Sequence, residues 1–211
     1  AERGNSFDLG FDTKIEDFDL DLAITFFKSE QKNSLLNESR TGWVMRNASS
    51  VNTSEGVELQ SQWSPLGKKY DLGLNYTFTD TFDANTCSED HKNAYSDNEC
   101  RHTGNAVATA KVRVPRHALS TKIGYQLNSN FKTVLRGSYT GETRDFGNSN
   151  DSWTDQILTD YFVFDVGGVY KLSDNYNITF GLENIFDEKY EQAHEYSTLG
   201  RTFNFGLKKG Y

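Results

Sequence analysis

The chain has 211 residues, a mass of 24.0 kDa and a formal net charge of −8, enough for one domain or two small ones. Only 36% of the residues are hydrophobic, but 14% are aromatic. Because disordered chains are poor in aromatic residues, this composition favours a folded protein. The acidic balance, without a basic cluster, makes nucleic acid a poor partner.

The hydropathy of the chain restricts how it can meet a membrane. No stretch of about 18 apolar residues occurs, so we expect no transmembrane helix. Transmembrane strands are not excluded, because a barrel strand presents only alternate residues to lipid and its mean hydropathy stays low. The mean hydropathy of −0.70 is compatible with such strands.

Apolar and polar residues alternate along the whole chain, which is typical of β-strands. Phe18, Leu20 and Leu22, for example, alternate with aspartates. No apolar pattern continues at helical spacing for the ten or more residues that a helix needs, so we expect an all-β, antiparallel chain. About nine strands are predicted, around residues 7–11, 18–26, 57–63, 70–78, 119–127, 131–139, 162–170, 176–182 and 203–207.

The expected connections alternate between short and long. Short turns on one rim and long polar loops on the other are typical of bacterial outer-membrane barrels, in which the short turns are periplasmic. The short connections are rich in Pro, Gly, Asn, Asp or Ser, as hairpin turns are. The short connections are 14–17, 64–69, 128–130 and 171–175, and the long ones are 29–46, 80–115, 141–160 and 187–200.

Two environments fit the apolar face. A soluble antiparallel sandwich or barrel would alternate in the same way and use this face as its core. Charged residues on the polar face, such as Asp21, Lys122 and Arg136, and aromatic residues near strand ends favour lipid instead. Nine strands leave two open edges, which lipid does not tolerate. We therefore expect a part of a larger barrel with Ala1 at the extracellular rim; an even strand count would allow a small closed barrel.

A motif near the C-terminus resembles a known family. Residues 182–190 read Leu-Glu-Asn-Ile-Phe-Asp-Glu-Lys-Tyr, and Gly200-Arg201 follows at the start of the last expected strand. This is similar to the end of TonB-dependent outer-membrane receptors, in which an N-[LI]-F-[DN]-x-x-Y segment precedes a Gly-Arg pair. Residues 3–10, 54–59 and 114–117 resemble further segments of that family. Tail and loop spacing look most similar to cobalamin receptors, followed by siderophore and haem receptors.

The resemblance implies a fold, a location and partners. Residues 1–211 would be the C-terminal portion of a 22-stranded barrel, without its plug domain and N-terminal strands. Such a receptor lies in the bacterial outer membrane and imports a scarce nutrient, such as cobalamin, an iron–siderophore complex or haem, when the TonB system acts on the plug. Its partners would be outer-membrane lipid, the remaining strands and plug, TonB and the ligand. The alternatives are a small standalone barrel, acting as a passive pore, adhesin or structural protein, and a soluble all-β binding module.

Ligand capture in such receptors falls to the outer loops and the plug, so aromatic loop residues are the candidate ligand-binding residues. A large amphipathic ring can stack on a corrin, a haem or a catecholate. The same rings can instead pack loops together or belong to a membrane girdle. The candidates in the expected long loops are Trp43, Tyr95, Trp153 and Tyr196.

Two further predictions concern folding. Cys87 and Cys100 lie in a segment rich in Asp, Asn and Ser, where no core can bury a thiol, so we expect a disulfide and an oxidising compartment. The resemblance also implies that the end of the chain carries the signal read by the barrel-insertion machinery. Asn204, Gly206 and Tyr211 fit that pattern, and a membrane-girdle role for Tyr211 is the alternative.

The sequence contains no recognisable catalytic pattern. The four histidines lack the paired spacing of a metalloprotease, and neither a phosphate-binding loop nor a nucleophile elbow is present. We therefore expect no catalytic residues, no cofactor and no metal site, and a protein that is not an enzyme.

Overall fold

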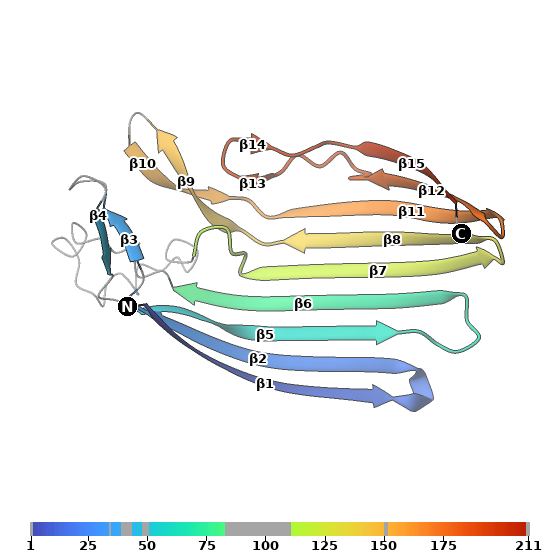
Figure 1. The fold of residues 1–211 in the computed structure, drawn as a ribbon, viewed down its shortest axis with the longest axis horizontal. Coiled ribbons are helices and arrows are strands. Elements are labelled where there is room, and N and C mark those ends of the chain that lie inside the picture. The colour runs from blue at the N-terminus through green and yellow to red at the C-terminus, as the bar shows by residue number, and fades with distance from the viewer. Residues whose placement is uncertain are drawn as a thin grey trace.

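The computed structural model describes residues 2–33, 35–38, 44–47, 51–82, 111–149 and 152–209; in 35–38, 44–47, 146–149 and 152–155 it describes the backbone alone. Nine strands form one antiparallel sheet in which each strand pairs with its neighbours in chain order (Figure 1). Within the described residues, no helix is long and apolar enough to cross a membrane. The sheet contains β1 (Arg3–Ile15), β2 (Leu20–Lys32), β5 (Val51–Trp63), β6 (Tyr70–Phe82), β7 (His117–Asn128), β8 (Phe131–Thr140), β11 (Tyr161–Ser173), β12 (Tyr176–Glu183) and β15 (Thr202–Lys209).

The nine predicted strands are confirmed, but several of them are longer than expected. β2 continues to Lys32 and β6 to Phe82, into segments expected to be loops. Three expected loops also contain two-stranded hairpins, which the sequence analysis missed because their residues are mostly polar and lack the alternation that marks the strands of the sheet. These hairpins are β3 (Leu35–Glu38) with β4 (Val44–Asn47), β9 (Thr143–Ser149) with β10 (Ser152–Leu158), and β13 (Glu191–Ala193) with β14 (Tyr196–Ser197).

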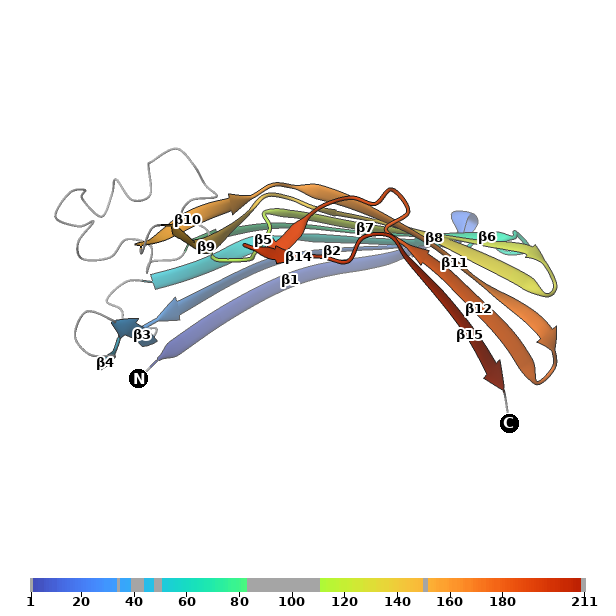
Figure 2. The same ribbon diagram turned by 90° about the horizontal axis from the view of Figure 1, so that it is seen from above.

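The two ends of the sheet differ as predicted. The short turns, one of which contains the 3₁₀ turn η1 (Glu16–Phe18), lie at one end, and the long connections and hairpins lie at the other, which we call the outer end (Figure 1). β1 begins at the outer end and β15 finishes at the turns. The sheet is curved, and its edge strands bend to the same side (Figure 2). Among the described residues β1 pairs with β2 and β15 with β12, so the sheet does not close on itself.

The strand register separates apolar from polar side chains across the whole sheet. One cross-strand row contains an apolar residue from each of the nine strands, and the adjacent row, on the other face, is polar or charged apart from one glycine. We call the two sides the lipid face and the polar face. The apolar row is Ile15, Leu20, Trp63, Leu72, Ile123, Leu135, Val166, Leu182 and Phe203; the polar row is Lys14, Asp21, Gln62, Gly73, Lys122, Arg136 and Asp165.

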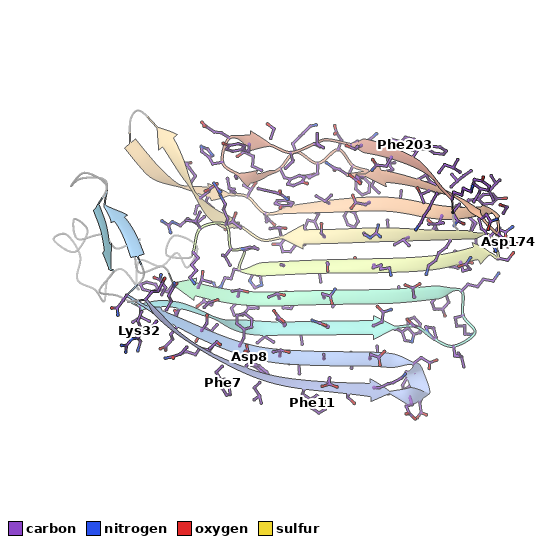
Figure 3. The ribbon with its side chains drawn as sticks, viewed as in Figure 1. Phe7, Asp8, Phe11, Lys32, Asp174 and Phe203 are labelled. Carbon is purple, nitrogen blue, oxygen red and sulfur yellow. The ribbon has the colours of Figure 1, made fainter. Side chains whose placement is uncertain are left out.

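The lipid face is uncovered. Phe7, Phe11 and Phe203, on the two edge strands, are 65–68% exposed (Figure 3). In the part of the chain that the structure describes, the one buried hydrophobic side chain is Leu158, and the other buried residues are polar, charged or glycine. A soluble sandwich would bury this face against a second sheet, so the arrangement agrees with the membrane interpretation.

Aromatic side chains border the lipid face at both ends. Near the turns the Trp63 and Tyr70 rings lie 5.4 Å apart, and the Trp63 indole N–H donates to the Phe18 carbonyl at 2.8 Å. Near the outer end Phe78 lies 5.3 Å from the His117 ring. Tyr70 and Phe78 are eight residues apart in β6, about 27 Å along a strand, which is close to the ~25 Å apolar band of outer-membrane barrels.

Candidate ligand-facing site

A hollow of about 590 Å³ opens on the polar face at its outer end. Its wall consists of polar-face side chains of β8, β11 and β12, and the segment between β12 and β15 borders it. Hydroxyl and amide groups accompany the carboxylates of Asp165 and Glu183, and no Lys, Arg or His side chain among the described residues lines the hollow. The hollow therefore suits a polar ligand bound by hydrogen bonds. Its lining residues are Ser138, Thr140, Tyr161, Val163, Asp165, Glu183, Asn184, Tyr190, Gln192, Ser197, Thr198, Leu199, Gly200 and Thr202.

Two tyrosines hold the segment after β12 against the wall. The rings of Tyr161, at the start of β11, and Tyr190 stack at 4.2 Å. Burial raises the pKa of the Tyr190 hydroxyl, and the neighbouring Tyr161 raises it further. Both rings line the hollow, and the Tyr190 hydroxyl therefore stays protonated and able to donate a hydrogen bond at neutral pH.

Asn184 forms the turn that redirects the chain after β12. Its backbone has φ 49°, a left-handed conformation that Asn tolerates better than most residues. Its side chain accepts from the Glu188 amide at 2.8 Å and donates to the Glu188 carbonyl at 2.9 Å, and its own amide donates to Asp165 Oδ1 at 2.8 Å. The asparagine of the recognised motif is thus a buried structural residue.

Asp187 joins the two ends of the segment between β12 and β15. Its carboxylate accepts from the Arg201 amide at 3.0 Å and from Lys189 Nζ at 3.1 Å, and these groups lower its pKa, the amide more than the lysine. A Cβ on Gly200 would lie 2.5 Å from Asp187 Oδ1, so a larger residue there would displace the Asp187 carboxylate from its position. The Gly-Arg pair of the motif therefore acts on Asp187 chiefly through the Arg201 amide, and the Arg201 charge adds a smaller effect.

A single buried carboxylate connects three outer segments. Asp145, in β9, is 0% exposed. Its oxygens accept from Arg113 Nε at 3.0 and 3.1 Å and from the His194 amide at 2.7 Å. The Arg113 amide also donates to the Arg144 carbonyl at 2.8 Å. Asp145 thus links the residues before β7 to the β9–β10 and β13–β14 hairpins; sequence reasoning missed it because its partners are distant in the chain.

A family model decides which proteins share this architecture. The model described as "TonB dependent receptor-like, beta-barrel" matches residues 1–185. The chain belongs to this family. The predicted family, the antiparallel barrel fold and the outer-membrane location are therefore confirmed.

Solved structures share the fold of this TonB-dependent receptor chain. The ferripyoverdine receptor of the Pseudomonas aeruginosa outer membrane has a TM-score of 0.73 at 14% identity. The match includes 99% of this chain and 27% of the receptor. The ferric-catecholate import receptor Fiu of E. coli K12 has a TM-score of 0.71 at 17% identity, with 99% and 27% covered. The FrpB iron transporter of Neisseria meningitidis has 0.69 at 15%, with 98% and 31% covered. The chain thus spans about a quarter to a third of these proteins, and a search of curated proteins found no match.

Of the four predicted ligand-binding aromatic residues, the structure describes the side chain of Tyr196 alone. Tyr196, in β14, is 73% exposed and lines neither the hollow described above nor a second one of about 430 Å³ beside the β13–β14 hairpin. Only the backbone of Trp153 is described, in β10, and Trp43 and Tyr95 lie outside the described residues. Their role in ligand binding stays a prediction.

The remaining predicted residues are also untested. Cys87, Cys100 and Tyr211 lie outside the described residues, so the disulfide and the assembly signal stay predictions. Asn204 Nδ2 donates to Glu183 Oε1 at 2.8 Å, and a Cβ on Gly206 would lie 2.7 Å from Thr179 Oγ1, so both residues also have structural roles. The described residues contain no His, Cys, Asp and Glu group that could hold a metal ion.

Proposed function

We propose that this chain forms part of the wall of an outer-membrane receptor that actively imports a scarce nutrient and is not an enzyme. The observation that carries the proposal is the family match over residues 1–185, together with a polar hollow at the outer end of the wall. In this position the hollow faces ligands that arrive from outside the cell.

The open edges of the sheet support further strands as partners. β1 and β15 each present an unpaired backbone edge among the described residues, and such an edge in lipid leaves donors and acceptors unsatisfied. We infer that the remaining strands of the receptor close the barrel, that a plug domain covers the polar face, and that TonB acts on this plug to release the ligand inward.

The ligand class we favour is an iron–siderophore complex. Three similar structures are named for ferripyoverdine, for ferric catecholate and for iron transport. Cobalamin, to which the tail and loop spacing pointed, and haem are the other candidates. Siderophore complexes and cobalamin offer many hydrogen-bonding groups that the hydroxyls, amides and carboxylates of the hollow can meet, whereas haem offers chiefly its two propionates.

Uptake by whole cells tests this function. Bacteria with and without the gene for this protein would receive ⁵⁵Fe-loaded hydroxamate and catecholate siderophores or ⁵⁷Co-cyanocobalamin, before and after inactivation of TonB. We expect gene-dependent uptake of one of these ligands that ceases without TonB. Gene-dependent entry of many small solutes that is indifferent to TonB would instead support a passive pore.

The role of Tyr196 is testable by measuring binding of the imported ligand to the same cells. Replacing it by Ala should weaken ligand binding about 2- to 10-fold if its ring stacks on the ligand, since such contacts contribute about 0.5–1.5 kcal/mol. Tyr176→Ala is the matched control, because it removes a partly exposed tyrosine next to the inner turn Asp174–Asn175. Equal binding by the two variants would remove Tyr196 from the site.

A further inference from the structure

Four charged residues form a row on the lipid face at the outer end of the sheet. Lys28 of β2 is opposite Glu55 of β5, and Glu55 is opposite Asp80 of β6. Arg116, directly before β7, completes the row with a contact to Asp80. Lys28, Glu55 and Asp80 each lie two positions farther toward the outer end than an apolar residue of the same strand and face. The row therefore lies just outside the outer border of the apolar surface.

The contacts keep both cations on this face. Lys28 Nζ lies 3.0 Å from Glu55 Oε2, and Arg116 Nη2 lies 3.4 Å from Asp80 Oδ1. The Arg116 guanidinium also lies over the Phe78 ring, 5.3 Å from its centroid. All four side chains are about half exposed. The row is therefore fixed by its neighbours and still open to a partner in the membrane.

The order of charges in the row is informative. Glu55 and Asp80 are cross-strand neighbours of like charge, which is unfavourable by itself. Lys28 flanks Glu55 at one end of the row, and Arg116 flanks Asp80 at the other. An ammonium has three donors and a guanidinium five, so a carboxylate contact leaves donors for a second acid. Lys28 and Arg116 are three strand spacings apart, about 14 Å, which separates two anion-binding positions.

We propose that the row Lys28, Glu55, Asp80 and Arg116 binds a phosphorylated lipid of the outer leaflet. Lys28 and Arg116 each bind a phosphate of its headgroup. The acyl chains lie along Phe26, Val57 and Phe78, which are on the same face and nearer the middle of the sheet. The spare donors of the two cations at the ends of the row and the continuity of the row with the lipid face favour this occupant. The proposal goes beyond nutrient uptake and does not depend on which ligand is transported.

Lipid retention by the protein purified from outer membranes in detergent tests the proposal. Native mass spectrometry would measure binding of diphosphorylated lipid A and of the same lipid after enzymatic removal of its phosphates. We expect the Lys28→Gln/Arg116→Gln double variant to bind the phosphorylated lipid at least about tenfold more weakly. Lys209→Gln is the matched control, because Lys209 lies on the lipid face at the opposite end of the sheet, opposite Tyr176, and should bind as the wild type does.

A second variant tests the same surface with the opposite sign. Glu55→Gln removes a negative charge and releases Lys28 from its ion pair, so it should bind the phosphorylated lipid more tightly than the wild type. This variant decides the question if the double variant does not reach its heat-resistant folded form. Equal binding of phosphorylated and dephosphorylated lipid, or binding that neither the double variant nor Glu55→Gln changes, would overturn the proposal.

Discussion

The sheet and the outer segments are stabilised in different ways. In the sheet, the same pairing repeats over nine strands, and a residue is acceptable if its polarity suits the face on which it lies. At the outer end, three segments depend on the carboxylate of Asp145, and one turn depends on the side chain of Asn184. In the wall, the effect of a substitution therefore depends on which face of the sheet the residue lies on. At the outer end, the effect depends on the identity of single side chains.

The largest expected effect follows from reversing polarity on the lipid face. Leu74, in the middle of β6, lies on this face, and Leu74→Arg should reduce the free energy of unfolding by about 2–4 kcal/mol. Its neighbour Asn75 faces the other side, where its side chain meets Ser120 at 3.3 Å, so Asn75→Arg should cost much less. Urea unfolding in detergent micelles measures both. Similar losses in the two variants would mean that the faces are assigned wrongly.

Removing the Asp145 carboxylate should loosen the outer end and leave the sheet intact. Asp145→Ala leaves Arg113 Nε and the His194 amide without their acceptor, a local cost of about 1–3 kcal/mol. We expect faster hydrogen exchange in β9, β13 and residues 111–116, with unchanged exchange in β6 and β7. Glu142→Gln is the control, because Glu142 is exposed and adjoins the same hairpin. A uniform rise in exchange throughout the sheet would show that Asp145 supports the wall as well.

Asn184 allows a test of conformation against hydrogen bonding within one turn. Asn184→Ala loses both side-chain hydrogen bonds to Glu188. It also places alanine at φ 49°, a left-handed conformation that its Cβ disfavours. Asn184→Gly loses the same bonds but relieves the left-handed strain, so it should retain about 1 kcal/mol that the alanine variant loses. Hydrogen exchange of residues 184–190 measures the difference. If the glycine variant is the less stable, flexibility of the unfolded chain outweighs the strain.

The sequence predicted the wall well and the outer end poorly, for physical reasons. Alternation is a local signal, and the lipid face requires it in each strand, so strands such as 70–78 and turns such as 64–69 were found. The Arg113–Asp145 pair spans 32 residues, and Asp145 and His194 are 49 apart, so no local pattern indicates them. The motif at 182–190 contains Asn184, but its resemblance to the family did not indicate that this residue forms a turn. The charged row has a local signal in the sequence, since Lys28 and Asp80 continue the lipid-face spacing of Phe26 and Phe78.

The smallest expected effect compares two exposed aspartates at opposite ends of the sheet. The Arg201 amide, followed by Lys189, lowers the pKa of Asp187, and Lys171 lowers the pKa of Asp174 in the turn between β11 and β12. Because folding favours both charged forms, their contributions are fully present above the ordinary value of 3.8 and disappear as the pH falls through the lowered pKa. Carboxyl ¹³C titration of the folded protein should show both shifts.

Only the Asp187 titration should affect the outer segment. As the pH falls through the lowered pKa of Asp187, protonation weakens the acceptor of the Arg201 amide, and the exchange protection of that amide should decrease relative to its intrinsic rate. Asp187→Asn should abolish the pH dependence, whereas Asp174→Asn should leave it unchanged, because Asp174 contacts Lys171 at the other end of the sheet. A pH dependence that survives Asp187→Asn would assign the closure of this segment to a different acid.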